Sequence, residues 1–221
     1  YLICSQGKCA GIFPVLPEKY RGIPCTDYKD DLIIPGLTDL HVHAPQYTFR
    51  ASGMDLELLD WLNTYAFPQE ARYENLEFAR SAYSIFAEDM KKSPNTRACI
   101  FGTLHVPATE LLMELMDKTG LKTMIGKVNM DRNGSPILQE TSAEASAQAT
   151  VTWIEDTLNR FENTTPILTP RFTPACTDQL MAKLSQIQKK YHLPMQSHLS
   201  ENFGEIEWVK ELCPGTHFYG E

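Results

Sequence analysis

LIIPGLTDLHVH, residues 32–43, is the stretch of sequence that decides the fold. Its apolar run and Pro-Gly step lead into a strand that we expect to end near His43. His41 and His43 are two positions apart, so on a strand their side chains point to the same side. Two imidazoles at one strand end suit a divalent metal, although an isolated H-x-H pair also arises by chance on protein surfaces.

Helical and extended patterns alternate along the rest of the chain. Predicted helices cover 55–66, 74–92, 109–118, 141–161, 177–191 and 203–212, and later predicted strands cover 98–104, 123–130, 167–172 and 195–199. This alternation predicts a parallel sheet, and the sequence contains neither a G-x-G-x-x-G nor a G-x-x-x-x-G-K-[ST] phosphate loop. We therefore predict an α/β protein with a partial N-terminal β segment over 1–32. About five βα units of a (β/α)8 TIM barrel would follow over 33–221.

Composition narrows the classes of function. The 221 residues carry a net charge of −8, which argues against binding to a nucleic-acid backbone. No apolar run reaches the roughly 20 residues needed to span a bilayer. Six cysteines without a C-x-x-C pair are interpreted as free thiols of a reducing compartment. The first residue is Tyr1, so we expect the native N-terminus to lie outside this sequence, and a targeting segment is neither seen nor excluded.

A third histidine and an acid lie where the last predicted strand ends. Functional residues of a (β/α)8 barrel lie at the C-terminal ends of its strands, which favours His198 as a metal ligand. The alternative is a buried histidine bonded to a backbone carbonyl. Glu201 follows three residues later and could shuttle protons beside a metal-activated water. It could equally be an acid at a helix N-terminus, and the two roles are compatible.

The motifs together resemble a known family. Residues 35–43 resemble the P-G-[LF]-[IV]-D-x-H-x-H signature of the amidohydrolase superfamily, and HAPQY at 43–47 resembles its guanine deaminase family. The similarity continues in DLELLDWL (55–62), YAFPQE (65–70), GKVNMD (126–131), TPRF (169–172) and QSHLSEN (196–202). Because these motifs occur in order over 33–212, we interpret them as family membership rather than coincidence.

The resemblance implies a hydrolytic reaction, guanine plus water giving xanthine plus ammonia. It implies one Zn²⁺ per complete active site, with Fe²⁺ as the alternative metal, and His41, His43 and His198 as ligands. Glu201 would be the proton shuttle. The resemblance further implies a cytoplasmic homodimer that acts on a small purine and engages neither nucleic acid nor membrane.

Four other residues take roles from the same resemblance. Gln46, Arg171 and the backbone of Phe172 would hold the purine, since a guanidinium supplies rigid donors to carbonyl and ring-nitrogen acceptors. A salt bridge at a loop is the alternative for Arg171, and its neighbours do not decide between the two. His105, after the second predicted strand, is assigned a supporting or packing role rather than direct ligation.

Two departures from the family pattern stand out. Residues 95–97 read Asn-Thr-Arg where relatives usually have Gly-Thr-Thr, which alters a turn and no ligand. The family completes its metal site with a fourth histidine and an aspartate on later strands, and neither motif occurs before Glu221. We therefore expect these residues alone to be inactive. Two alternatives stay open: another amidohydrolase that deaminates cytosine, a triazine or an adenosine derivative, and a non-catalytic fragment.

Overall fold

A computed structural model describes residues 1–221, which divide into two compact units, Tyr1–Pro35 and Gly36–Glu221. The first unit contains an antiparallel pair, β1 (Leu2–Ser5) and β2 (Lys8–Ile12), and the short 3₁₀ helix Glu18–Tyr20. Gln6 and Gly7 close the β1–β2 turn, both at positive φ. The sequence predicts strands and turns here and places the boundary between the units at 32/33.

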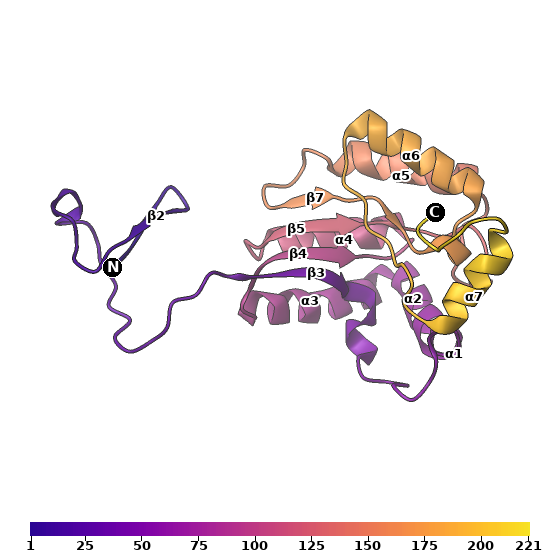
Figure 1. Cartoon of the computed structure of the whole chain (residues 1–221), viewed down its shortest axis with the longest axis horizontal. Coiled ribbons are helices and arrows are strands. Elements are labelled where there is room, and N and C mark those ends of the chain that lie inside the picture. The colour runs from indigo at the N-terminus through magenta and orange to yellow at the C-terminus, as the bar shows by residue number, and fades with distance from the viewer. The chain divides into compact units, whose positions relative to one another are not determined.

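A parallel sheet forms the centre of the second unit (Figure 1). Its order is β3-β4-β5-β7, formed by Leu37–His43, Asn95–Phe101, Lys122–Gly126 and Thr164–Pro166. A second parallel pair, β6 (Val128–Asn129) with β8 (Thr169–Pro170), lies just beyond the ends of β5 and β7 in the chain. Neighbouring parallel strands require a crossover, and helices supply it.

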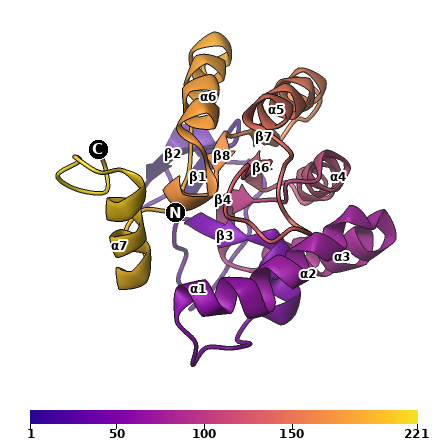
Figure 2. The ribbon, with the colours of Figure 1, turned by 90° about the vertical axis from the view of Figure 1, so that its right-hand side faces the viewer.

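Helices separate the strands and form the outer layer. They are α1 (Leu58–Trp61), a π-helical turn (Leu62–Ala66), α2 (Phe67–Ala71), α3 (Leu76–Lys92), α4 (Val106–Asp117), α5 (Ala143–Thr157), α6 (Asp178–Tyr191) and α7 (Phe203–Leu212). Figure 2 shows α3, α4, α5 and α6 fanned around one side of the strands. Side-chain caps start several of them: Asn75, Ser142, Thr177 and Asn202 each accept a backbone N–H of the first turn. Strands inside and helices outside give the βα architecture of a (β/α)8 barrel, as predicted.

The main core lies between the sheet and this outer layer. Trp153, Tyr83 and Phe86 bury their rings completely there, against Ile100 and Ile125 of the sheet. A smaller apolar cluster surrounds Phe101, Phe172 and Met130 at the carboxyl ends of the strands. Phe172 of this cluster also lines the site described below.

Prolines shorten the strands that the sequence predicts as continuous. The segment 167–172 contains only β8, and β7 ends before it at Pro166. β8 ends at Pro170, which has no N–H to extend a ladder. The predicted strand 123–130 is divided between β5 and β6, and Lys127 separates them. β4 begins at Asn95 rather than at 98, because Asn95 pairs with Leu37.

The predicted fifth strand, 195–199, is wrong as a strand. Only Met195 forms a β-bridge, to Leu168, because the next residue of β8 that could donate to this segment is Pro170, which has no N–H. Backbone hydrogen bonds nevertheless hold the segment beside β8, from Gln196 N to Leu168 O at 2.9 Å and from His198 N to Arg171 O at 3.1 Å. The extended course of the chain is retained even though the ladder is not.

Two further expectations concern the whole chain. All six cysteines are free thiols. None of the helices combines the length and the apolar character that crossing a membrane demands.

Candidate active site

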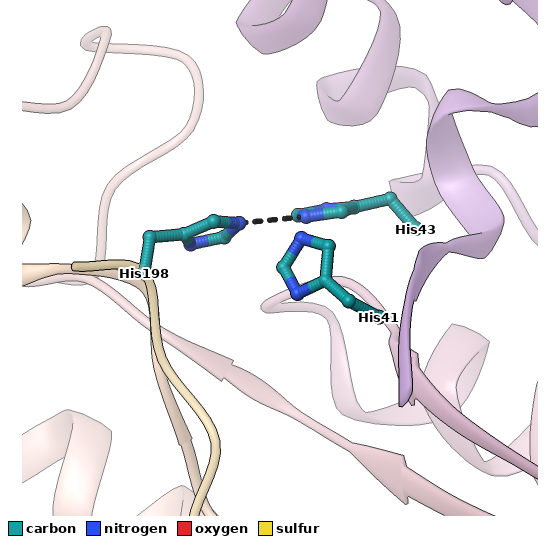
Figure 3. Close-up of side chains that lie close together, drawn as sticks. All are labelled: His41, His43 and His198. Atoms are coloured by element: carbon teal, nitrogen blue, oxygen red, sulfur yellow. Dashed lines mark hydrogen bonds between the residues drawn. The ribbon is translucent and has the colours of Figure 1, made fainter. Parts of the chain in front are cut away.

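Three histidines converge at the carboxyl end of the sheet (Figure 3). His41 and His43 come from the last positions of β3, and His198 comes from the extended segment after α6. One ring nitrogen of each lies within 4.8 Å of those of the other two, and Nε2 of His43 is 2.9 Å from Nε2 of His198. The structure thus brings together the three residues that the sequence assigns to a metal.

Phe101 supports this cluster and was missed by the sequence reasoning. Its ring centroid lies 4.4 Å from that of His43 in a stacked arrangement, and 4.6 and 5.0 Å from those of His198 and His41. Phe101 is the last residue of β4 and pairs in register with His43. The register of two parallel strands was the signal that could have found it.

Burial keeps the imidazoles neutral. It lowers the pKa of His43 well below its usual value and that of His198 to about 4. Burial also lowers the pKa of His41, and nearby Asp39 opposes that effect. Neutral imidazoles have a free nitrogen lone pair at neutral pH, which is the form that binds metals.

A backbone carbonyl orients His198. Its Nδ1 lies 2.6 Å from the carbonyl oxygen of Arg171, so Nδ1 carries the proton and donates it to that oxygen. Nε2 is then the acceptor and faces His43. Histidine ligands in proteins usually donate their other N–H in this way, which fixes tautomer and ring orientation.

The histidines form one wall of a pocket of about 360 Å³. The polar residues around it are His41, His43, Gln46, Arg171, His198 and Glu201, and the apolar side is lined by Gly53, Met54, Leu56, Leu58, Trp61, Leu62 and Phe172. All the residues predicted to bind metal or purine therefore face one cavity. Gly53, Met54 and Leu56 contribute part of the apolar side from the turn before α1. The sequence predicts a helix from residue 55, but α1 begins only at Leu58.

Glu70 connects the two predicted purine-binding side chains. Its Oε2 accepts from Nη1 of Arg171 at 2.6 Å and its Oε1 from Nη2 at 3.0 Å. The same Oε1 accepts from Nε2 of Gln46 at 2.9 Å. The salt-bridge alternative for Arg171 is thus realised, and the residue also lines the pocket. Sequence reasoning quoted Glu70 within YAFPQE but gave it no role, since nothing local in the sequence indicates its pairing with Arg171.

Glu201 lies on the pocket wall in a constrained turn. The preceding Ser200 has φ +57°, a left-handed conformation unusual for a residue with a side chain. Burial and the neighbouring Glu205 raise the pKa of Glu201, while Arg171 opposes them. The helix-terminal role that the sequence offers for Glu201 belongs to Glu205, whose carboxylate closes a capping box with Asn202 at the start of α7.

The sequence model of the Amidohydrolase family matches residues 32–220. The chain belongs to the amidohydrolase family. It is 42% identical over 190 residues to a guanine deaminase of Rattus norvegicus, covering 86% of this chain and 42% of that protein. It is 34% identical over 226 residues to the guanine deaminase of Escherichia coli, and the match covers 99% of this chain and 50% of that protein.

A solved structure agrees with the sequence matches. The guanine deaminase from C. acetobutylicum with bound guanine superposes on this amidohydrolase with a TM-score of 0.95 at 42% identity, covering 99% of this chain and 52% of that one. The chain spans about half the length of the curated relatives it matches.

His105 of this amidohydrolase stands apart from the three clustered histidines. It precedes α4, does not line the pocket, and its Nε2 is buried without a hydrogen-bond partner. Burial lowers its pKa, so the ring is neutral. This placement agrees with a packing role. His192 and His217, to which the sequence assigns no role, are exposed.

Proposed function

We propose that the full-length protein is a metal-dependent guanine deaminase. The observation that carries this proposal is that three neutral imidazoles and the Gln46–Arg171 pair face one pocket. The similarity to guanine deaminases over nearly the whole of this chain supports the choice of substrate. The reaction balances as guanine plus water giving xanthine plus ammonia.

His41, His43 and His198 would hold the metal. The donor set fits a zinc ion, because imidazole nitrogen is a preferred ligand and the ring nitrogens are already gathered within 4.8 Å. Zinc, or Fe²⁺ in its place, would supply Lewis-acid activation of water. Burial lowers the pKa of all three rings, which favours the uncharged form that binds a cation at neutral pH.

Gln46, Arg171 and the backbone of Phe172 would orient the purine. A guanidinium is permanently charged and presents rigid N–H donors, which suit the carbonyl oxygen and ring nitrogens of guanine. Burial of Arg171, 2% exposed, removes competing water from this interaction. Polar groups fixed in this way reject bases that leave them unpaired.

Glu201 would move the protons. Its raised pKa favours a protonated carboxyl that can donate to the ring nitrogen beside the carbon bearing the amino group. The resulting carboxylate can then take the proton from the attacking water and pass it to the leaving ammonia. Arg171, which lowers the same pKa, keeps the carboxylate form accessible.

A substrate panel tests the proposal. The zinc-loaded full-length protein should produce xanthine and one equivalent of ammonia from guanine, and much less ammonia from cytosine, a triazine or adenosine. A strong preference for one of these other compounds would replace guanine deamination with another amidohydrolase activity. No turnover of any of them by protein of verified zinc content would exclude the deaminase assignment.

The proposal also covers the cellular compartment and the oligomeric state. We propose a cytoplasmic homodimer, in keeping with the family resemblance and with six free thiols. Light scattering of the full-length protein measures its mass in solution, and a monomer at micromolar concentration would contradict the dimer. Cell fractionation tests the compartment.

A further inference from the structure

Glu70 is a buried carboxylate that touches the pocket only through other side chains. It lies in α2, is 2% exposed and is absent from the pocket lining. Its two oxygens receive three hydrogen bonds, two from Arg171 and one from Gln46. Arg171 is also held from another side, since its guanidinium carbon lies 5.1 Å from the ring centroid of Phe67.

The ionised carboxylate of Glu70 determines how the Gln46 amide and the Arg171 guanidinium are oriented. An ionised carboxylate only accepts, so the amide of Gln46 must direct its NH₂ group toward Glu70. Its Oε1 is then the atom left to serve a ligand. Arg171 donates one N–H of each Nη to Glu70, and its remaining guanidinium N–H groups are still available as donors. The pocket wall therefore presents an acceptor from Gln46 beside donors from Arg171.

We propose that Glu70 is a positioning residue that sets this donor–acceptor order and thereby selects a lactam edge. A lactam edge offers a carbonyl acceptor next to a ring N–H donor, which complements Arg171 beside Gln46. An amidine edge offers an amino donor next to a bare ring nitrogen and reverses the pattern. This inference rests on the proposed function, because it assumes that the pocket takes a purine.

Two purines separate these edges cleanly. Guanine and 2,6-diaminopurine carry the same 2-amino leaving group, but guanine has the lactam edge and 2,6-diaminopurine the amidine edge. In Glu70→Gln the amide can donate as well as accept, so Gln46 is free to turn its NH₂ group toward the pocket. The substitution thus changes the polarity of the wall with almost no change in volume.

The chain offers a matched control. Lys127 and Glu140 form another buried ion pair, and neither residue lines the pocket. Glu140→Gln therefore removes a comparable buried charge at a place that does not face the ligand. If the only effect of losing a buried charge is lower stability, Glu70→Gln and Glu140→Gln should change kcat/KM for the two purines in the same way.

The experiment measures kcat/KM of the zinc-loaded full-length protein and both variants with each purine. Glu70→Gln should lower kcat/KM for guanine by about 10- to 100-fold, the range expected for lost hydrogen bonds to a charged group. Zinc content should be unchanged, and the preference for guanine over 2,6-diaminopurine should fall at least about 10-fold. Glu140→Gln should leave that preference at the wild-type value. Equal losses for both purines, or an unchanged rate, would overturn the proposal.

A second measurement does not depend on turnover. If the wild type makes no xanthine, the proposed function fails, and crystal structures of the wild type and Glu70→Gln then test positioning directly. We expect the Gln46 amide and the Arg171 guanidinium to leave their wild-type positions in the variant. Identical positions for both side chains would refute the role of Glu70, whatever the substrate.

Discussion

Removing the Arg171 side chain should cost stability as well as binding. The guanidinium and the Glu70 carboxylate are 3% and 2% exposed, so water cannot replace either partner. In Arg171→Ala the carboxylate keeps only its hydrogen bond from Gln46. Breaking a buried ion pair in this way typically costs about 3–5 kcal/mol, against a total stability of about 5–15 kcal/mol for a domain. A turnover defect in this variant would therefore mix lost recognition with partial unfolding.

Urea unfolding of the full-length protein, followed by circular dichroism, measures this cost. We compare Arg171→Ala with the double variant Arg171→Met and Glu70→Leu, which removes both charges and roughly conserves volume. The single variant should lose about 3–5 kcal/mol and the double variant clearly less, because it leaves no orphaned charge. If the free energy of unfolding of Arg171→Ala lies within about 1 kcal/mol of that of the wild type, the Arg171–Glu70 ion pair contributes less than its burial implies, and the reasoning is refuted.

Glu201→Gln should retain zinc and the fold but lose about 10²- to 10⁴-fold in kcat, and a rate within a factor of about two of wild type would remove its proton-transfer role. His41→Ala or His198→Ala should lose most bound zinc by elemental analysis, and full stoichiometry with a normal rate would exclude these ligands. Because the pKa of His198 is lowered to about 4, the zinc-free folded state binds fewer protons than the unfolded state below pH 6.5. Its stability should fall as the pH drops from about 6.5 toward 4, and a flat unfolding profile there would contradict the burial argument. Gly126→Ala would drive a Cβ into the side chain of Thr169 and to 2.7 Å from the carbonyl oxygen of Ile167, so we expect about 1–3 kcal/mol of destabilisation. An unchanged melting temperature would show that both can move.

The sequence was most informative where function depends on local spacing. The H-x-H pair at the end of a strand predicted two adjacent imidazoles, and the structure has them there. Alternating patterns predicted the order of strands and helices, although prolines shortened the strands around 164–170 and left 195–199 with a single bridge. Hydrophobic periodicity does not register a missing N–H, so it overestimates strand length at such places.

Long-range pairing was the part that no local pattern could supply. Glu70 and Arg171 are 101 residues apart, and only the folded chain brings them together. The support of Phe101 for the histidines depends likewise on the register between two strands. A lone acid in a helix and a lone aromatic in a strand have ordinary explanations, so neither stood out before the structure placed them.

The bond between His198 and the carbonyl of Arg171 has a consequence for how this pocket can change. Every residue in a chain contributes a backbone carbonyl. The hydrogen bond that orients His198 therefore survives any replacement at position 171 that preserves the backbone path. Under the proposed function, the base preference can therefore change while metal binding persists, provided that position 70 changes together with position 171. Combinatorial libraries that randomise 70 and 171 together should be rich in folded, metal-binding members with altered base preference, whereas libraries that randomise 171 alone should yield mostly unstable ones.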